Sequence, residues 1–217
     1  KGLEDAPPER IVSTGFAAET QPSKPLEAET PLALDTDYLF WFEVGERVEG
    51  SIEAADVELP VDKLPPEARL DVVLFGFEGE LILTSGADVG QIKIQPNGTV
   101  RVTKPVAQPA ALMGDELMSR RLFFPVRTPA QAGVYRMRCN IYYRQTLVQS
   151  RLVTVQAVAS PARQAEAALR SVVDYTLSKM LNGHQLEGMG HNVLSVMLND
   201  NGNGTHGFRF FGENEFK

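Results

Sequence analysis

The sequence predicts a mainly β protein, in which an antiparallel β-sandwich precedes an α-helix and a C-terminal β-hairpin. Residues 120–158 carry the clearest pattern, because two long runs of alternating side chains flank the polar break Arg144-Gln145-Thr146. Several shorter apolar runs upstream are separated by turn residues, with no helical period among them. After Ser160-Pro161 the apolar spacing becomes helical.

Six short runs in the first half are predicted to be strands: 10–16, 37–44, 70–77, 81–83, 91–94 and 99–102. The run 37–44 carries large apolar side chains on both faces up to Trp41, so we expect a central strand that is covered on both sides. Asn97-Gly98 predicts a hairpin over 91–103, because both residues tolerate positive φ. Residues 17–30 and 104–118 are predicted to be loops.

Three strands are predicted in the second half, at 121–127, 134–143 and 147–158. Pro125 cannot donate to a ladder and marks an edge or a bulge. Alternation in 134–143 places Tyr135, Met137, Cys139 and Ile141 on one face, which we expect to be the inner one.

Gly133-Val134-Tyr135 resembles a tyrosine corner, in which a phenol hydrogen-bonds back to the preceding corner. The sandwich is therefore expected to be immunoglobulin-like. Cys139 is the only cysteine, which excludes a disulfide-bearing immunoglobulin domain and favours a reducing, cytoplasmic location.

A helix is predicted over 160–183, since Ser160 can cap it, Pro161 suits its first turn and Asn182-Gly183 suits its end. Its apolar stripe comprises Ala165, Ala168, Leu169, Val172, Val173, Thr176, Leu177, Met180 and Leu181. Two strands, 192–198 and 205–211, form the predicted hairpin. The resulting division is a polar lead-in (1–9), a sandwich domain (10–158) and an appendage (159–217) that begins a following domain, because a helix and a hairpin are too small to fold alone.

Composition limits the function classes. The 217 residues are 43% hydrophobic, which is enough for a core, and the formal net charge of -7 argues against nucleic-acid and membrane-surface partners. No run reaches the roughly 18 apolar residues that a membrane span needs. Because the chain ends directly after a strand-like run, we expect a soluble piece of a longer polypeptide.

Metal and nucleophile patterns are weak. Asn199, Asn201 and Asn203 imitate the start of a calcium loop, but the twelfth position is Phe210 instead of an acid. A polar turn is the favoured interpretation. His184, His191 and His206 with Cys139 lack zinc-ligand spacing, and Cys139 in an inward strand position is typical of a small core residue. We predict no catalytic, metal or cofactor residue.

Other candidates have ordinary structural interpretations. The loop acids Glu78, Glu80, Asp88, Asp115 and Glu116 could pair for glycoside chemistry but suit a solvated rim. The aromatic residues Tyr38, Phe40 and Trp41 could form a sugar platform but suit a core. Arg136, Arg138, Arg144 and Arg151 form a basic stripe that could contact an acidic partner but suits a cross-strand ladder with nearby glutamates.

Four segments carry a family resemblance: 38–45, 121–127, 133–143 with 149–152, and 198–211. They resemble regions upstream of caspase-like CHAT protease domains in bacterial multidomain proteins of signalling and conflict (defence) systems. In that family the His and Cys dyad lies downstream, so the resemblance assigns no catalytic residue here.

The resemblance implies a non-catalytic interaction or regulatory module that contacts a protein partner or other domains of the same polypeptide. Residues 142–145 and the Asn97-Gly98 turn are the expected contact points, and the tail could mediate homo-oligomer formation. A carbohydrate-binding or hydrolytic sandwich and a structural oligomerisation module remain the alternatives.

Overall fold

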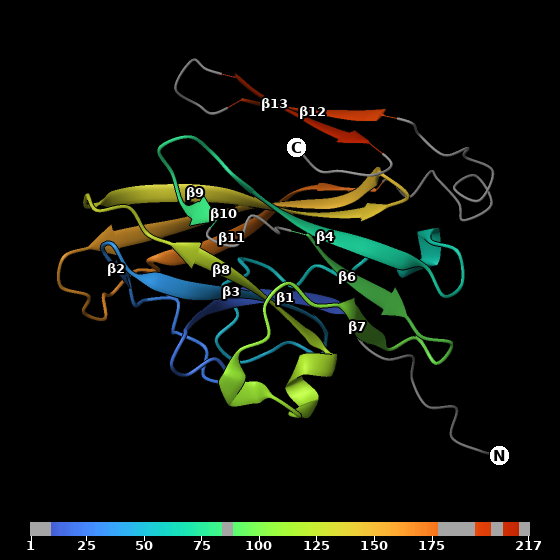
Figure 1. The fold of residues 1–217 in the computed structure, drawn as a ribbon, viewed down its shortest axis with the longest axis horizontal. Coiled ribbons are helices and arrows are strands. Elements are labelled where there is room, and N and C mark those ends of the chain that lie inside the picture. Colours follow the sequence, from blue (N-terminus) through green and yellow to red (C-terminus); the bar gives the residue numbers. More distant parts are fainter. Residues whose placement is uncertain (1–9, 84–88, 178–193, 201–205, 213–217) are drawn as a thin grey trace.

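A computed structural model describes residues 10–83, 89–177, 194–200 and 206–212. Two β-sheets stack face to face, and we call residues 10–177 the two-sheet body. A separate two-stranded hairpin lies beyond the larger sheet, on the side away from the smaller one (Figure 1). The protein is therefore mainly β, as predicted.

The smaller sheet has four strands in the order β1-β3-β8-β5. They are β1 (Ile11–Ala18), β3 (Asp37–Gly45), β8 (Arg121–Arg127) and β5 (Ile82–Leu83). β3 is central, with buried side chains on both faces, which confirms the prediction for 37–44. β5 pairs only with Val126 and Arg127 of β8, and before Pro125 the Phe123 carbonyl of β8 accepts from Ala107 N–H at 3.0 Å.

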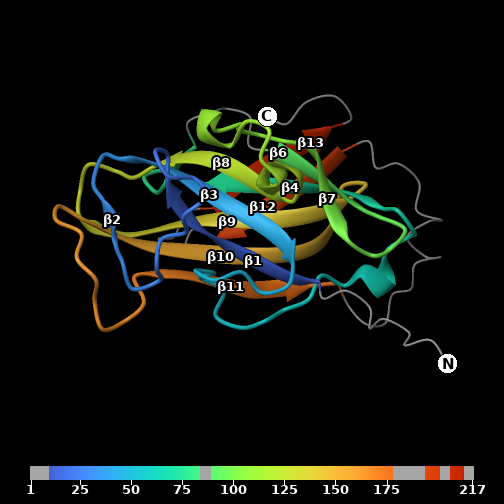
Figure 2. The same ribbon diagram turned by 90° about the horizontal axis from the view of Figure 1, so that it is seen from below.

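The larger sheet runs in the order β11-β10-β9-β4-β6-β7 (Figure 2). Its strands are β11 (Leu169–Thr176), β10 (Thr146–Val158), β9 (Gly133–Tyr143), β4 (Arg69–Gly76), β6 (Val89–Ile94) and β7 (Val100–Lys104). The short β2 (Leu32–Ala33) pairs in parallel with the end of β10.

The main hydrophobic core fills the space between the two sheets. Phe40 of the smaller sheet packs there, with ring centroids 5.4 Å from Phe16 and 6.3 Å from Phe124. Met137, Cys139 and Ile141 of β9 are fully buried in the same core, so the predicted inner face of this strand is confirmed.

The helix predicted over 160–183 is wrong where the structure describes it, because residues 169–176 form strand β11. Leu169 and Ser171 are buried whereas Arg170 is exposed, which is a period of two. The β-branched Val172, Val173 and Thr176 suit a strand, and β10 supplies backbone partners that an isolated pattern cannot show. The predicted helix end at Asn182-Gly183 lies outside the described residues.

The connection 104–118 is more ordered than a simple loop. It contains two 3-10 helices, η2 (Ala110–Leu112) and η3 (Glu116–Ser119); a third, η1 (Val61–Lys63), precedes β4. Leu112 and Leu117 pack with Trp41 and Phe123 in a second, smaller apolar cluster. The connection thereby covers the outer face of the four-stranded sheet.

Two tight turns lie at one end of the two-sheet body. The predicted Asn97-Gly98 hairpin forms between β6 and β7, although only Gly98 has a positive φ, of 84°. Arg144 and Gln145 form the whole β9–β10 turn, with φ of 45° and 66°. At the other end of β9, the Tyr135 hydroxyl donates to the Gln131 carbonyl at 2.7 Å, the bond expected of a tyrosine corner.

One lateral opening between the sheets is closed by residues 51–59. Ile52 N–H donates to the Thr14 carbonyl on β1 at 2.9 Å. The Ile52 carbonyl accepts from Ser171 N–H on β11 at 2.8 Å, and Ala54 N–H donates to the Ser171 carbonyl. This segment therefore bridges an edge of each sheet.

The predicted C-terminal hairpin is present as β12 (Leu194–Asp200) and β13 (His206–Gly212). It is hydrogen-bonded into neither main sheet. Within the described ranges, no helix has the length and apolarity required to cross a membrane.

Candidate functional site

The structure places Cys139 in the core, as its inward strand position predicted. Burial raises the pKa of the Cys139 thiol to about 12, so a nucleophilic thiolate is disfavoured at neutral pH. His184, His191 and the loop residues Asn201 and Asn203 lie outside the described residues, as does the His206 side chain. No metal-binding group of His, Cys, Asp and Glu side chains occurs in the described part of the chain.

Three of the five loop acids, Glu80, Asp115 and Glu116, have separate structural partners. Glu80 accepts from Arg136 Nη2 at 2.8 Å, and the Asp115 carboxylate caps η3 by accepting from Leu117 N–H at 2.8 Å. Glu116 lies 3.8 Å from Arg101, Glu78 lies in the exposed β4–β5 turn, and Asp88 is outside the described residues. The described contacts therefore hold Glu80, Asp115 and Glu116 against different neighbours instead of in one carboxylate pair of the kind that glycoside chemistry needs.

The candidate sugar platform is core. Phe40 and Trp41 are fully buried and Tyr38 is 8% exposed. The Trp41 indole N–H donates to the Phe16 carbonyl at 3.3 Å, and the Tyr38 hydroxyl accepts from Ala33 N–H. Their faces are unavailable to a sugar ring.

The predicted basic stripe divides between surface and interior. Arg136 pairs with Glu80 in the β4–β5 connection, and Arg138 pairs with Asp174 of β11 at 2.5 Å, so both pair with acids but only Arg136 pairs with a glutamate. Arg144 lies over the Tyr143 ring, 5.3 Å from its centroid. Arg151 is instead completely buried.

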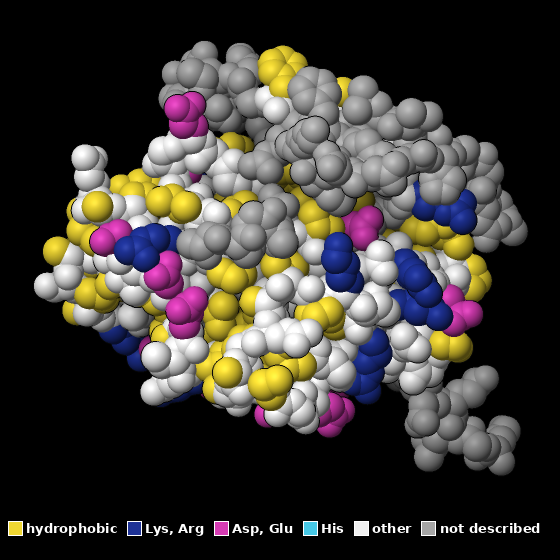
Figure 3. All heavy atoms as spheres, viewed as in Figure 1, with side chains coloured by type: hydrophobic (Ala, Val, Ile, Leu, Met, Phe, Trp, Pro, Cys, Tyr) yellow, Lys and Arg dark blue, Asp and Glu magenta, His cyan; other side chains and the backbone are white. Residues whose placement is uncertain are grey.

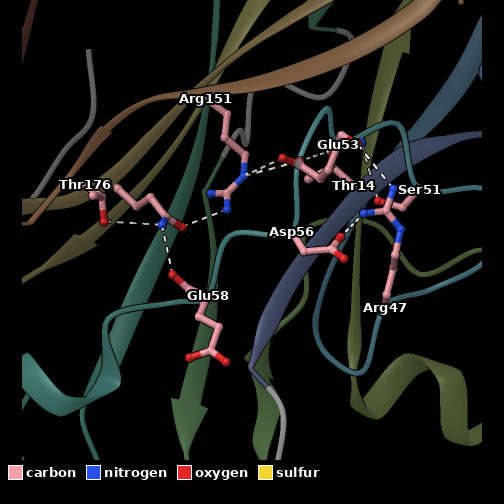
Figure 4. A network of polar contacts seen from close by, with 9 residues as sticks. Thr14, Arg47, Ser51, Glu53, Asp56, Glu58, Arg151 and Thr176 are labelled. Carbon is pink, nitrogen blue, oxygen red and sulfur yellow. Dashed lines mark hydrogen bonds and ion pairs between the residues drawn. The ribbon is translucent and has the colours of Figure 1, made fainter.

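Arg151 is the centre of a buried polar network that joins the two sheets (Figure 4). Its Nε lies 3.3 Å from the Glu53 carboxylate, and these side chains are 0% and 1% exposed. Glu53 also accepts from the Thr14 hydroxyl of β1 at 2.6 Å. Arg151 Nη2 donates to Gln149 Oε1, whereas Nη1 has no acceptor among the described residues.

The network continues towards the surface through Arg47. Arg47 Nη2 donates to the backbone carbonyl of Glu53 at 3.3 Å, and Nη1 pairs with Asp56. Figure 4 shows Arg47 and Asp56 beside the chain segment that carries Glu53. Arg47 in turn lines a cleft at the end of the two-sheet body.

We call this cleft, of about 490 Å³, the arginine cleft. Its charged lining is Glu43, Glu46, Arg47, Arg101, Glu116, Arg120 and Arg121. Its volume lies within the range of small ligand sites, roughly 300 to 1,000 Å³. The end of β3, the start of β8 and the β6–β7 hairpin position these side chains.

Glu43 is the innermost acid of the cleft. Its two oxygens lie 3.2 Å from Arg120 Nε and 2.8 Å from Arg121 Nε. The Arg121 side chain is only 4% exposed and stacks over Trp41, 4.3 Å from the ring centroid. Burial lowers the pKa of Arg121, while Glu43 opposes this shift.

A basic row continues from the cleft across the larger sheet. Arg69, Lys93 and Arg101 are cross-strand neighbours on β4, β6 and β7. Lys93 bonds to Glu67 at 2.7 Å and lowers the pKa of that carboxyl. In Figure 3 several Lys and Arg side chains lie on the right side of the molecule, and others lie on the left among acidic side chains.

Sequence reasoning missed the arginine cleft. One signal was Glu43, a single acid that interrupts an apolar strand, and another was the adjacent pair Arg120-Arg121 before a buried strand. Their convergence depends on the pairing of Glu43 with Arg121 across β3 and β8. That register is not visible in either segment alone.

The hairpin carries a different surface. Val196, Leu198 and Phe208 are 53%, 57% and 61% exposed, and Leu198 is the cross-strand partner of Phe208. We call these three side chains the hairpin apolar face. Adjacent exposed apolar groups of this size are typical of contact surfaces.

No protein-family model and no solved structure matches the chain. The chain is 48% identical over 214 residues, or 99% of its length, to a protein of Vitiosangium sp. (strain GDMCC 1.1324) named "Probable protease". The match spans 28% of that protein. The chain is therefore similar to one segment, rather than to the whole, of a larger protein with a protease name.

Proposed function

We propose that this chain is a non-catalytic interaction or regulatory module of a larger bacterial protein that also carries a protease region. The observation that carries the proposal is the match to 28% of the Vitiosangium protein, most of whose length lies outside the similarity. The buried Cys139 thiol, with a pKa of about 12, is unsuited to be the nucleophile of a cysteine protease.

The more specific form of the proposal is an immunoglobulin-like sandwich upstream of a caspase-like CHAT protease in a cytoplasmic signalling or conflict system. Its support is the resemblance of segments 38–45, 121–127 and 133–143, together with the tyrosine-corner bond of Tyr135. A single free cysteine, buried in the core, suits a reducing compartment.

The proposed contact surface towards the rest of the polypeptide is the hairpin apolar face. A two-stranded hairpin is marginally stable in water, and β12–β13 is outside both main sheets. The occupant is the part of the longer polypeptide that corresponds to the unmatched length of the relative. Burying Val196, Leu198 and Phe208 there would stabilise both hairpin and interface.

The complete open reading frame is the first test of the protease association. We expect a caspase-like His and Cys dyad downstream of Lys217. A stop codon soon after Lys217, with no protease region elsewhere in the same polypeptide, would contradict the proposal.

Hydrogen exchange tests the docking surface. Amides of β12 and β13 should exchange more slowly in the longer polypeptide than in the 217-residue chain. The double variant Leu198→Ser/Phe208→Ser should lose this protection, whereas Ile82→Ser, which changes a side chain 50% exposed on β5, should keep it. Equal exchange in both proteins, or a dimer of the 217-residue chain through this face, would refute the assigned occupant.

A further inference from the structure

The inner part of the arginine cleft carries more positive than negative charge. Arg120 and Arg121 share the single carboxylate of Glu43, so the three side chains have one excess positive charge. The other arginines of the cleft have their own acids: Arg47 pairs with Asp56, and Arg101 lies near Glu116 and bonds to Ser119 at 2.6 Å. The excess charge is therefore local to the Arg120 and Arg121 pair.

The same pair has donors left over. Each guanidinium uses its Nε towards Glu43, and neither has an acceptor for its terminal nitrogens among the described residues. The Arg121 side chain is only 4% exposed, and it nevertheless lines the cleft. Unlike Arg151 Nη1, these nitrogens are not sealed away from solvent, so they are available in the cleft to donate to an incoming oxygen acceptor.

The donors are also preorganised. Trp41 is fully buried and holds the Arg121 guanidinium against its ring, while Glu43, itself largely buried, fixes the Nε edge. The fork that remains has the geometry that guanidinium groups use for a carboxylate or a phosphate. Little side-chain entropy would be lost when Arg121 binds such a group.

We propose that the arginine cleft binds a single carboxylate of a peptide segment, with Arg120 and Arg121 as its donors. A singly charged carboxylate matches the single excess charge. A phosphate dianion would exceed it and would be repelled by Glu46 and Glu116, which line the same cleft. An uninterrupted acidic run is disfavoured for the same reason.

This assignment rests on the proposed function, because it names the chemistry of the segment that such a module would recognise. Trp41 is the only tryptophan and touches Arg121, so its fluorescence reports on the cleft without a label. The probe is the end-blocked pentapeptide Gly-Ala-Glu-Ala-Gly, titrated into the 217-residue chain. Its glutamine counterpart and inorganic phosphate are the comparison ligands.

We expect a saturable change in Trp41 fluorescence with the glutamate peptide and none with the glutamine peptide. Arg120→Gln, at a side chain 53% exposed, should fold normally and weaken binding about tenfold or more, because a charge-assisted bond is lost. The matched control Arg144→Gln, in the β9–β10 turn, should leave the affinity unchanged. Added salt should weaken binding.

Several results would overturn the assignment: no saturable change, equal binding of the glutamine peptide, tighter binding of phosphate, or equal losses in Arg120→Gln and Arg144→Gln. Arg120 Nε–H resonances in NMR spectra give a second readout that does not depend on Trp41. These titrations use the 217-residue chain alone, so their failure is distinguishable from failure of the hairpin docking, which is tested in the longer polypeptide.

Discussion

Cys139 and Tyr142 lie on strand β9, where burial penalises the charged forms of both side chains. Burial raises the pKa of the Cys139 thiol from 9.0 to about 12, and that of the Tyr142 phenol from 10.0 to about 12. Between these values the folded chain keeps protons that the unfolded chain has released. The stability that these two groups contribute is therefore fully present below about pH 9 and is lost as the pH rises towards 12.

The pH dependence gives the first prediction. The free energy of unfolding, measured by urea titration, should fall between pH 9 and 11 with a slope of up to about 1.4 kcal/mol per pH unit for each group. Cys139→Ala should start from a lower stability but show a shallower slope, because the thiol no longer contributes. An identical slope in the variant would contradict the assignment to Cys139.

Glu53 has a structural role of comparable importance. It is the only described acid in contact with the buried Arg151 guanidinium, whose Nη1 already has no acceptor among the described residues. Glu53→Gln keeps the shape but leaves a buried positive charge unpaired. We expect a loss of about 3 to 5 kcal/mol in the free energy of unfolding, measured by chemical denaturation.

The double variant Glu53→Gln/Arg151→Met is the control for this prediction. Removing both charges should recover part of the loss, because an apolar side chain of similar volume needs no counter-ion. If the double variant lost more free energy of unfolding than the two single variants lost together, the ion pair would not be the origin of the effect.

Among the elements, the β9–β10 turn departs most from ordinary backbone preference. Arg144 and Gln145 both have positive φ, a region that Asn and Gly occupy more readily. Arg144-Gln145→Asn-Gly should therefore stabilise the protein by about 1 kcal/mol, after loss of the contact of Arg144 with Tyr143. Thermal unfolding should show this as an increase in Tm of about 2 to 4 °C.

Gly98→Ala provides the opposite control at the β6–β7 turn. Gly98 already occupies the positive-φ position there, with φ of 84°, so an added Cβ should lower the Tm. A lower Tm for the Asn-Gly variant as well would show that contacts of the native turn outweigh its backbone strain.

The elements also show what the sequence could predict. Apolar runs identified β1, β3 and β4, and alternation identified the β9–β10 pair. β11 escaped detection because its apolar residues satisfy a helical stripe and a strand equally well. The deciding contacts, to β10 and to residues 51–59, come from distant parts of the chain.

The candidate site was predictable only in part. Turn chemistry and core aromatic residues were local and were identified correctly. Arg151 was grouped with the surface arginines because it shares their sequence neighbourhood, whereas its burial depends on Glu53 in a segment without regular structure. The cleft is likewise formed by β3, β8 and the β6–β7 hairpin, and no spacing in the sequence predicts that these three elements lie together.

At the scale of the whole molecule, residues 51–59 connect the two sheets laterally. They bond to β1 on one side and to Ser171 of β11 on the other, and they carry Glu53 into the interior. The same segment reaches the arginine cleft through the bond from Arg47 to the Glu53 carbonyl. Residues 51–59 therefore take part in the buried network and in the lateral closure, and they contact Arg47 of the cleft. Strand β11 completes the lateral closure.

The extent of the folding unit can be tested by truncation. A chain that ends at Leu177 keeps β11, with Leu169 buried in the core and Ser171 bonded to Ile52, so we expect cooperative urea unfolding close to that of the 217-residue chain. A chain that ends at Val158 exposes the edge of β10 and opens the closure beside Glu53. It should lose several kcal/mol, because buried Leu169 alone contributes about 2 kcal/mol, and bind an apolar dye. Equal unfolding midpoints for the two truncated chains would instead support the predicted domain boundary at residue 158.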